Sequence, residues 1–350
     1  MEHKEDFVTS TDRLNSSISS STLDENLIQQ LKTIIIRINF YFGIIIYFFG
    51  ILGNTLNILI LSQRSLRSNT CIMIFLASSI TGIITILFGL TSRMVPDGSG
   101  DIADRVRWIC KIRAFIVFTC RSATFWLIML ATFDRWAVSS TNPRFRQLCS
   151  TKNVLRYIFF IIIISIIIHC QYLYCYESDV PKSDMKCFNK NVVCRIVNGL
   201  LFAIVTIILP LILIAIFGLM TILKIRSSRS HVIPVPTVIA VYHPSQTVDH
   251  QQRRFKRTDR HLFIILFVQV ILLAFLTIPM AVQQLYITIT IDKRSNLQET
   301  ISNLSYHITL LMTYTATGMQ FYVNTLSGGR VFRKAIIDLR QLILQKIICR

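Results

Sequence analysis

The stretch CKIRAFIVFTCRSATFWLIMLATFDRW, residues 110–136, decides the fold of this chain. An α-helix needs ~20 mainly apolar residues to cross the roughly 30 Å core of a lipid bilayer, and this stretch meets that length. It begins with Cys110 and ends with Asp134-Arg135-Trp136. Charges next to the bilayer boundary are affordable, because an arginine side chain can reach the lipid headgroups. The stretch therefore predicts a membrane-spanning helix with Arg135 at one surface.

Six further apolar stretches of similar length lie on either side of it. Hydrophobic residues make up 52% of the chain and charged residues 16%, a balance that would leave too much apolar surface in water for a soluble domain. Together the stretches predict an all-α membrane protein, a seven-transmembrane helix bundle. The predicted spans are residues 39–61, 71–95, 109–136, 154–173, 197–223, 262–286 and 301–326.

The predicted spans divide the chain into three parts. Residues 1–35 are polar and rich in serine and threonine, which predicts a disordered tail. This tail contains Asn15-Ser16-Ser17, a sequence that permits glycosylation of Asn15 outside the cell. Residues 36–327 form the membrane domain. Residues 328–350 form a terminal segment, which is amphipathic from Val331 to Ile348 and carries Cys349, a predicted palmitoylation site at the membrane surface.

The charge of the loops predicts the orientation of the chain. One set of loops is strongly basic, whereas acidic residues offset the basic ones in the opposite set. Because Lys and Arg accumulate in cytoplasmic loops, this asymmetry predicts a plasma-membrane protein with an extracellular N-terminus and a cytoplasmic C-terminus. The basic loop residues are Arg64, Arg67, Arg144, Arg146, Lys152, Arg156, Lys224, Arg226, Arg229, Arg253, Arg254, Lys256 and Arg257.

These features resemble the rhodopsin-like (class A) G-protein-coupled receptors. Members of that family have a cysteine at the start of the third helix and an Asp-Arg-Tyr triplet further on. Arg135 follows Cys110 at the family's spacing of 25 residues, and Trp136 replaces the tyrosine. The overall pattern over about residues 36–348 is similar to invertebrate orphan receptors related to the neuropeptide receptors, such as those for FMRFamide-like peptides. Further matching positions are Gly53, Asn54, Pro210, Pro279 and, at the start of the family's short eighth helix, Val331 to Lys334.

The resemblance implies a receptor that binds an extracellular ligand and activates a heterotrimeric G protein by outward movement of helix six. It implies no enzymatic activity and no cofactor. In the family, an acid at the inner end of helix six pairs with the helix-three arginine at rest, which implies a contact between Arg135 and Asp259. The alternative for Asp259 is a solvated charge beside Arg257 and Arg260. The residues implied in coupling and switching are Asp134, Arg135, Trp136, Asp259, Pro279 and Asn54.

The resemblance also implies a disulfide from Cys110 to the loop between helices four and five. That loop offers Cys175, Cys187 and Cys194, and the family pattern favours Cys187. Cys175 and Cys194 are then available for a second bridge, as an oxidising compartment allows.

Several family positions are different in this chain. The second span contains no Asp or Glu, although the family has a buried Asp there, and Thr277 stands in place of the helix-six tryptophan. The Asn-Pro-x-x-Tyr motif of helix seven is missing, and residues 320–324 occupy that region. We therefore expect no sodium pocket of the family's kind.

Arg121 is the most unusual residue of the predicted spans. It lies 11 residues after Cys110, which is ~16 Å along a helix at 1.5 Å per residue, near the middle of the membrane. A charge there commonly costs ~3 kcal/mol or more, so we expect Arg121 to face a wet cavity. The hypothesis is that it binds an anionic or carbonyl group of the ligand. The alternative is an arginine satisfied by water, backbone carbonyls or glutamine side chains.

The neighbourhood of Arg121 predicts the kind of ligand. Val117 occupies the position where amine receptors of the family carry an Asp, so amine recognition is not expected. The remaining polar, aromatic and basic lining would suit a peptide with a carboxylate or amidated end, or a small molecule, better than a lipid. The predicted ligand-binding residues are Arg121, Val117, Phe118, Arg93, Gln283, Gln284, Tyr286, Tyr306 and His307.

The sequence also bears on four functions other than a G-protein-coupled receptor. The net charge of +19 would suit nucleic acid, but the basic residues lie between apolar stretches, so the expected partner is the lipid bilayer and no nucleic acid is expected. A transporter or channel usually shows paired intramembrane charges, broken helices or repeats. An enzyme or metal site is not expected, because His169 and His307 have no paired carboxylates or metal-ligand spacing. A receptor-like protein without G-protein coupling remains an alternative because of the changes in helix seven.

Overall fold

A computed structural model of the full chain gives its architecture. It describes residues 2–63, 66, 69–94, 106–140, 142–178, 187–230, 246–290, 295–327, 337 and 341. Within these ranges, the side chains of residues 2–23, 225–230 and 246–266 lie outside the description. Asn15, Asp259 and Cys349, each predicted to have a functional role, therefore have no described side chain.

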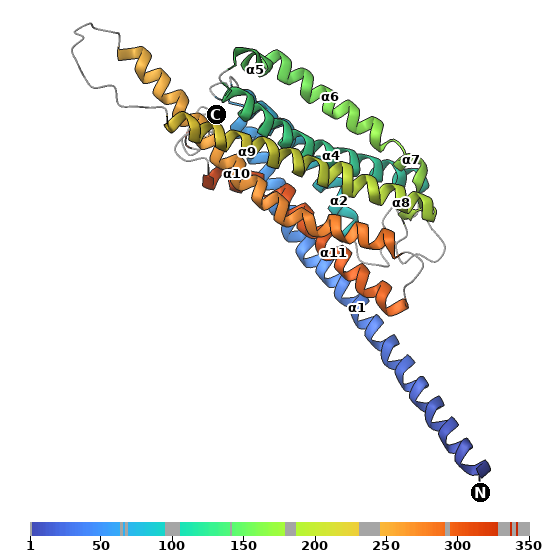
Figure 1. Cartoon of the computed structure of the whole chain (residues 1–350). Helices are drawn as coiled ribbons and strands as arrows, with labels where there is room; N and C mark the ends of the chain where they lie inside the picture. The colour runs from blue at the N-terminus through green and yellow to red at the C-terminus, as the bar shows by residue number, and fades with distance from the viewer. Residues whose placement is uncertain are drawn as a thin grey trace.

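Long helices lie side by side and form a single bundle (Figure 1). They are α1 (Glu2–Leu61), α2 (Thr70–Met94), α4 (Arg107–Val138), α6 (Thr151–His169), α9 (Leu209–Ser230), α10 (Gln246–Ile289) and α11 (Asn296–Gly318). The shorter elements are α5 (Pro143–Leu148), α7 (Tyr172–Cys175), α8 (Val192–Leu200), the π-helical segment η1 (Leu201–Ile208) and α12 (Gln320–Ser327). α4 lies at the centre, since it contacts α2, α6, η1, α9 and α10.

Six of the described helical segments are long and apolar enough to cross a membrane. Their bounds are Asp24–Leu61, Thr70–Met94, Arg107–Val138, Thr151–Cys175, Val192–Lys224 and Phe267–Ile289. By length and composition the chain is therefore a helical, multi-pass membrane protein, as the apolar stretches of the sequence predicted.

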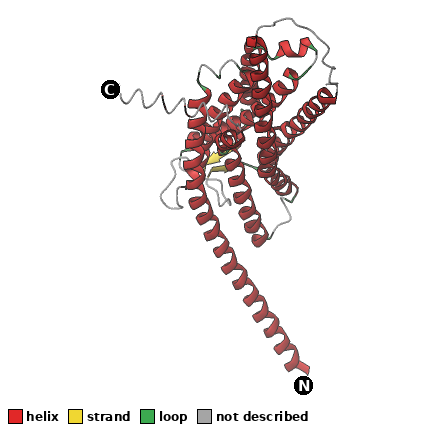
Figure 2. Cartoon of the chain, turned by 90° about the vertical axis from the view of Figure 1, so that its left-hand side faces the viewer, coloured by secondary structure: helices red, strands yellow, loops and turns green. Residues whose placement is uncertain are grey.

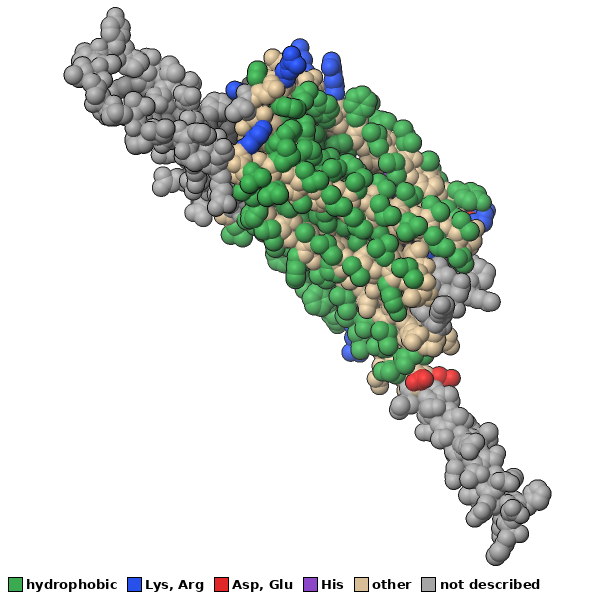
Figure 3. Space-filling model, viewed as in Figure 1, with side chains coloured by type: hydrophobic (Ala, Val, Ile, Leu, Met, Phe, Trp, Pro, Cys, Tyr) green, Lys and Arg blue, Asp and Glu red, His purple; other side chains and the backbone are tan. Residues whose placement is uncertain are grey.

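The outer surface of the bundle fits a hydrocarbon environment. Apolar side chains cover most of the middle of the face drawn in Figure 3, and Lys and Arg lie toward its ends. Large apolar side chains such as Phe159 and Phe275 are 62% and 69% exposed. A surface of this kind would be unfavourable in water over so large an area, but lipid chains can cover it.

α11 corresponds to the seventh predicted span, residues 301–326, and is more polar than the others. It begins with a capping box, in which Ser295 and Gln298 satisfy each other's backbone N–H groups. It packs against α1 and α10, and its buried threonines donate to carbonyls of the same helix. The helix ends at Gly318, and α12 continues after Met319, so the predicted span is interrupted at that residue.

The structure differs from the prediction at the N-terminus. Residues 1–35 were predicted to be disordered, but α1 begins at Glu2 and projects beyond the bundle (Figures 1 and 2). The physical reason is that the chain contains no proline or glycine before Gly43, so nothing interrupts a helix that the membrane span has already nucleated. The amphipathic segment predicted from Val331 to Ile348 lies almost wholly outside the described residues.

Two disulfides hold a short hairpin at one end of the bundle, which we call the Cys110 end. β1 (Tyr176–Ser178) pairs antiparallel with β2 (Cys187–Asn189), with Ser178 opposite Cys187. Cys110 is bonded to Cys187, the partner that the family resemblance favoured, and Cys175 is bonded to Cys194. The opposite end of α4, with Asp134 and Arg135, is called the Arg135 end.

A close approach between α1 and α11 depends on glycine. A Cβ atom added to Gly318 would lie 3.0 Å from the Cα of Gly50. We predict that Gly318→Val lowers the thermal unfolding midpoint of the purified protein, by an amount corresponding to ~1–3 kcal/mol, as is typical of overpacking. Gly218→Val is the matched control, because a Cβ at Gly218 meets no atom within 4 Å. An equal effect of the two substitutions would contradict this account of the helix contact.

Candidate functional site

Arg121 lies inside the bundle, as predicted, and the structure buries it almost completely. The residue is 2% exposed, and it shares the inward face of α4 with Val117, Thr124 and Ile128. Its Nε and Nη2 atoms are buried and have no hydrogen-bond partner. Among the described residues, no carboxylate forms an ion pair with it. The structure therefore contains a buried positive charge with two unsatisfied donors.

The Arg121 guanidinium lies over two aromatic rings. Its Cζ atom lies 4.2 Å from the ring centroid of Tyr314 and 5.8 Å from that of Phe202. Contacts of this kind stabilise a cation through the negative face of the ring, more strongly where water is excluded. They offset part of the cost of burial, but Nε and Nη2 still have no hydrogen-bond partner.

Two backbone features put these rings in place. Gly89 of α2 makes room for Tyr314, since any Cβ at Gly89 would overlap the tyrosine hydroxyl. Phe202 belongs to η1, a π-helical segment that changes the direction of its side chains relative to the α-helices around it. Trp126 of α4 donates from Nε1 to the carbonyl of Val205 in this segment at 3.1 Å.

An aromatic stack covers Arg121 on the side of the Cys110 end. Phe118 lies one turn before Arg121 and stacks on Tyr172, with ring centroids 4.2 Å apart. Phe118 also packs edge-on against Phe202, and Tyr172 contacts Tyr176 of the hairpin. Tyr172 has no exposed surface. The stack therefore separates the guanidinium from the hairpin and from the surface at this end.

Glu177, a described acid at this end, already has two basic partners. Glu177 of β1 accepts from Arg107 at 2.5 Å and lies 3.5 Å from Lys111. Burial alone would raise the pKa of the Glu177 carboxyl, but the hydrogen bond from Arg107 and the charge of Lys111 hold that pKa below its ordinary value. Glu177 therefore stays ionised and bound to α4 instead of compensating Arg121.

The structure brings together three more of the predicted ligand residues. Arg93 Nη1 lies 3.3 Å from His307 Nδ1, and the Arg93 guanidinium lies 5.9 Å from the ring centroid of Tyr306. Asn39 Nδ2 approaches the same His307 nitrogen at 2.9 Å. These side chains form a second cationic cluster nearer the Cys110 end, between α1, α2 and α11.

Other predicted ligand residues have different surroundings. Gln283 donates to the backbone carbonyl and hydroxyl of Ser302 and so joins α10 to α11. Gln284 approaches Gly199 of α8. Tyr286 was predicted to line the site, but it is 47% exposed on α10, at a surface position where it meets solvent or lipid. Contacts between helices give Tyr314, Phe202, Tyr172 and Tyr176 a role near Arg121 that the sequence does not indicate.

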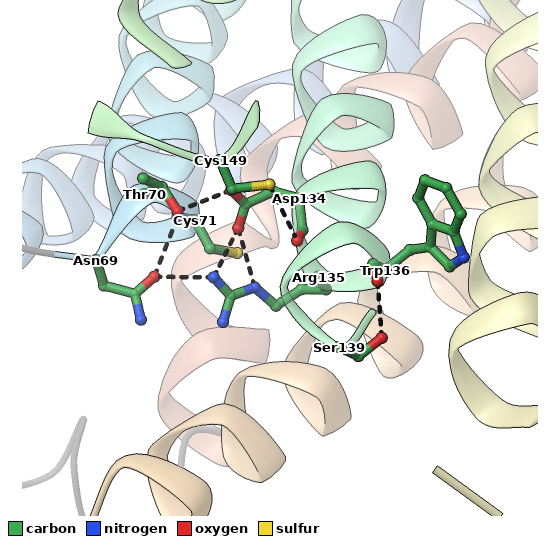
Figure 4. A network of polar contacts seen from close by, with 8 residues as sticks. All are labelled: Asn69, Thr70, Cys71, Asp134, Arg135, Trp136, Ser139 and Cys149. Carbon is green, nitrogen blue, oxygen red and sulfur yellow. Dashed lines mark hydrogen bonds and ion pairs between the residues drawn. The ribbon is translucent and has the colours of Figure 1, made fainter. Parts of the chain in front are cut away.

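A second candidate site lies at the Arg135 end (Figure 4). Asp134 Oδ2 accepts from Arg135 Nε at 3.1 Å and from Nη2 at 2.6 Å. Thr70 donates to Asp134 Oδ1 at 2.7 Å, and Arg135 Nη2 donates to Asn69 Oδ1 at 3.2 Å. The pair is therefore joined to the start of α2. The predicted contact with Asp259 stays a prediction, because that side chain lies outside the described residues.

Cys149 also belongs to this network. Its Sγ lies 3.7 Å from the backbone carbonyl of Asp134, to which it donates. Burial and the neighbouring charge of Asp134 raise the pKa of the Cys149 thiol to about 12. The thiol is therefore protonated at neutral pH and acts as a weak donor rather than as a nucleophile.

Trp136 contributes to the packing of the Arg135 end. Its ring lies 5.2 Å from that of Phe145 and 5.5 Å from that of Phe217. Lys224 Nζ lies 5.1 Å from the Trp136 ring centroid and donates to Ser140 Oγ at 2.9 Å. The tryptophan thus joins α4, α5 and α9, which a tyrosine ring would do with less contact area.

Neutral polar side chains connect α1, α2 and α12 between the two sites. Asn57 donates to Ser79 at 2.6 Å and accepts from Asn324 at 3.0 Å. Ser78 donates to Gln320 Oε1 at 3.0 Å. Nearby, Asn54 donates to the carbonyls of Gly50 and Thr317. No group of His, Cys, Asp and Glu suited to a metal occurs among the described residues.

Known proteins add no evidence to this geometry. No protein-family model matches the chain, and no curated protein is similar to it.

The hydrogen-bonded amides and hydroxyls around Asn57 carry no charge, which predicts how the protein responds to sodium ions. Amides and hydroxyls supply no negative charge to replace the hydration energy of a sodium ion, so we expect no sodium-specific binding. The thermal unfolding midpoint of the purified protein should be the same in sodium chloride as in potassium chloride at equal ionic strength. A midpoint that rises in sodium alone would show that the network binds a cation.

Proposed function

We propose that the chain is a rhodopsin-like receptor with seven membrane-spanning helices, with α11 as the seventh span. In this arrangement an extracellular ligand activates a heterotrimeric G protein. The observation that carries the proposal is the arrangement of α4, which has a disulfide-bonded Cys110 at one end and a buried Asp134–Arg135 pair at the other. Both features lie at the family's spacing along one central helix, although the helix-seven motif is absent.

Two observations support an extracellular Cys110 end. The two disulfides are compatible with an oxidising compartment, which the outside of the cell provides. In the sequence, the basic loops adjoin the helix ends that lie at the Arg135 end. The positive-inside rule therefore places the cytoplasm at that end. The N-terminus of α1 projects at the Cys110 end and is then extracellular (Figure 1).

Activation would be a shift between two packings of the helices. Pro279 lies inside α10, where it removes one backbone hydrogen bond and allows a bend. Outward movement of α10 would open the Arg135 end. Arg135 would then exchange Asp134 and Asn69 for a helix of the G protein, which would enter the opened groove. The hydrogen bonds from Thr70 and to Asn69 stabilise the resting arrangement.

The ligand site of this receptor would include Arg121, Phe118 and the cluster of Arg93, Tyr306 and His307. The ligand is a peptide or a small molecule that approaches from the Cys110 end. A movement of the aromatic stack would connect the site to α10 through Phe202, because η1 contacts α10.

One observation favours a receptor-like protein without G-protein coupling as the second candidate. Gln320 and Asn324 occupy the helix-seven region and bind neutral partners, so the family's usual switch residues are replaced there. Reconstitution of the purified protein with G proteins separates the candidates. A coupled receptor accelerates guanine-nucleotide exchange, and a receptor-like protein without coupling does not.

The Asp134–Arg135 pair predicts the effect of one substitution. Asp134→Asn removes the negative charge that holds Arg135, which should raise basal nucleotide exchange severalfold in cells at equal surface expression. Glu299→Gln is the matched control, because it removes one negative charge at an exposed position on α11. Unchanged or lower basal exchange in Asp134→Asn would argue against a resting lock at this pair.

Orientation can be tested with the two glycosylation sequences of the chain. Asn15-Ser16-Ser17 lies before the first span, and Asn303-Leu304-Ser305 lies inside α11. An extracellular N-terminus predicts a glycan that a peptide N-glycosidase removes and that Asn15→Gln abolishes. Asn303→Gln should leave the glycan unchanged, since a membrane-embedded asparagine is not modified. Absence of any glycan, with the N-terminus accessible to antibody only in permeabilised cells, would reverse the orientation.

A further inference from the structure

The unsatisfied donors of Arg121 are on one edge of the guanidinium. Nε and Nη2 point the same way, so their N–H groups form a parallel pair with the spacing that matches two acceptor oxygens. The Cζ atom of the group lies over the rings of Tyr314 and Phe202, which provide no hydrogen-bond acceptor oxygen to Nε or Nη2. This edge is therefore the part of the group that lacks a directional contact in this structure.

The energy of this arrangement favours a charged acceptor. A buried ion without a partner is unfavourable because it has lost its hydration and gained no opposite charge. Each unsatisfied donor adds a further desolvation penalty. A neutral acceptor would satisfy the donors but leave the charge uncompensated, whereas an anion removes both penalties at once.

The geometry then selects among acceptors. A carboxylate presents two coplanar oxygens to the two N–H groups and forms a bidentate pair. A carboxamide presents one oxygen, and its NH₂ group would face the second donor. An amidated peptide end would therefore leave one donor of Arg121 unsatisfied and its charge unpaired.

The walls of the site indicate what the carboxylate is attached to. Phe202 and Tyr314 flank the guanidinium, and both belong to an apolar cluster with Leu311 and Met280. Phe118 and Tyr172 complete the aromatic surroundings on the side of the Cys110 end. A flat apolar group beside the carboxylate fits these surroundings, and a strongly polar one would lose its hydration without replacement.

We propose that the Nε–Nη2 edge of Arg121 is a recognition site for a ligand carboxylate attached to an aromatic or apolar group. Within the receptor function proposed above, on which the signalling consequence rests, the ligand is an acid or a peptide with a free carboxyl end rather than an amidated peptide. Both nitrogen atoms of this edge are buried in this structure, so binding requires the side chains around Arg121 to move.

The test compares acids with their amides on the purified full chain in lipid nanodiscs. The probes are 3-phenylpropionate and 3-phenylpropionamide, with phenylphosphonate as the anion of different shape. Calorimetric titration should give at least tenfold tighter binding of the acid than of the amide. Equal binding of acid and amide would overturn the proposal, as would the absence of binding by the acid up to its solubility limit. Tighter binding of the phosphonate would overturn the assignment to a carboxylate in favour of a phosphate-like ligand.

Variants connect this preference to Arg121. Arg121→Lys keeps the charge but loses the paired donors, so the acid should bind at least tenfold more weakly than to the wild-type chain. Arg156→Gln, an exposed position at the Arg135 end, is the matched control and should bind like the wild type. Unchanged acid binding in a folded Arg121→Lys protein would overturn the proposal. If that variant does not fold, the acid–amide comparison on the wild-type chain still decides.

The binding test is independent of signalling. Selective acid binding without any accelerated nucleotide exchange would retain the carboxylate site and count against the receptor function. Accelerated exchange by an amidated peptide that is insensitive to Arg121→Lys would retain the receptor function and overturn the carboxylate site. The two failures are therefore distinguishable.

Discussion

The helices of this bundle turn apolar side chains outward, so polar groups must find their partners inside it. Because hydrocarbon offers no hydrogen bonds, a polar group without a partner there costs roughly several kcal/mol. The described interior follows this constraint in two ways. Thr313 and Thr317 donate to carbonyls of their own helix. Asn57 donates to Ser79 and accepts from Asn324, which joins three helices in one register.

The two buried arginines of α4, Arg121 and Arg135, obey this constraint to different degrees. Arg135 has a carboxylate beside it and an amide oxygen from the neighbouring loop, so its charge is compensated in the resting arrangement. Arg121 has only aromatic faces, and one edge is left unsatisfied. A compensated pair stabilises one packing of the helices. An uncompensated charge raises the free energy of the ligand-free state and favours any ligand that supplies the missing acceptor. The contrast gives the middle of α4 and its Arg135 end different roles within the proposed receptor.

Several features followed from local pattern, and others could not. The spans were predicted from the lengths of apolar stretches, because the bilayer imposes that length on every helix. Disorder was predicted for residues 1–35 from their polar composition. The structure instead has a helix from Glu2, because no proline or glycine before Gly43 interrupts it. Tyr286 was assigned to the site from its position near the end of a span, but the rotation of α10 turns it outward. Helix rotation depends on packing, which composition alone does not encode.

The sequence by itself determined the membrane class of the chain, the position of Arg121 within the third span and the set of cysteines available to Cys110. These follow from hydrophobicity and spacing along a single helix, which are local quantities. Only the tertiary structure decided that Tyr314 and Phe202 flank Arg121, that Gly89 makes room for the tyrosine and that the paired Nε–Nη2 donors have no partner. The physical reason is that these contacts join helices far apart in the chain, and their geometry depends on how the helices pack and rotate against one another.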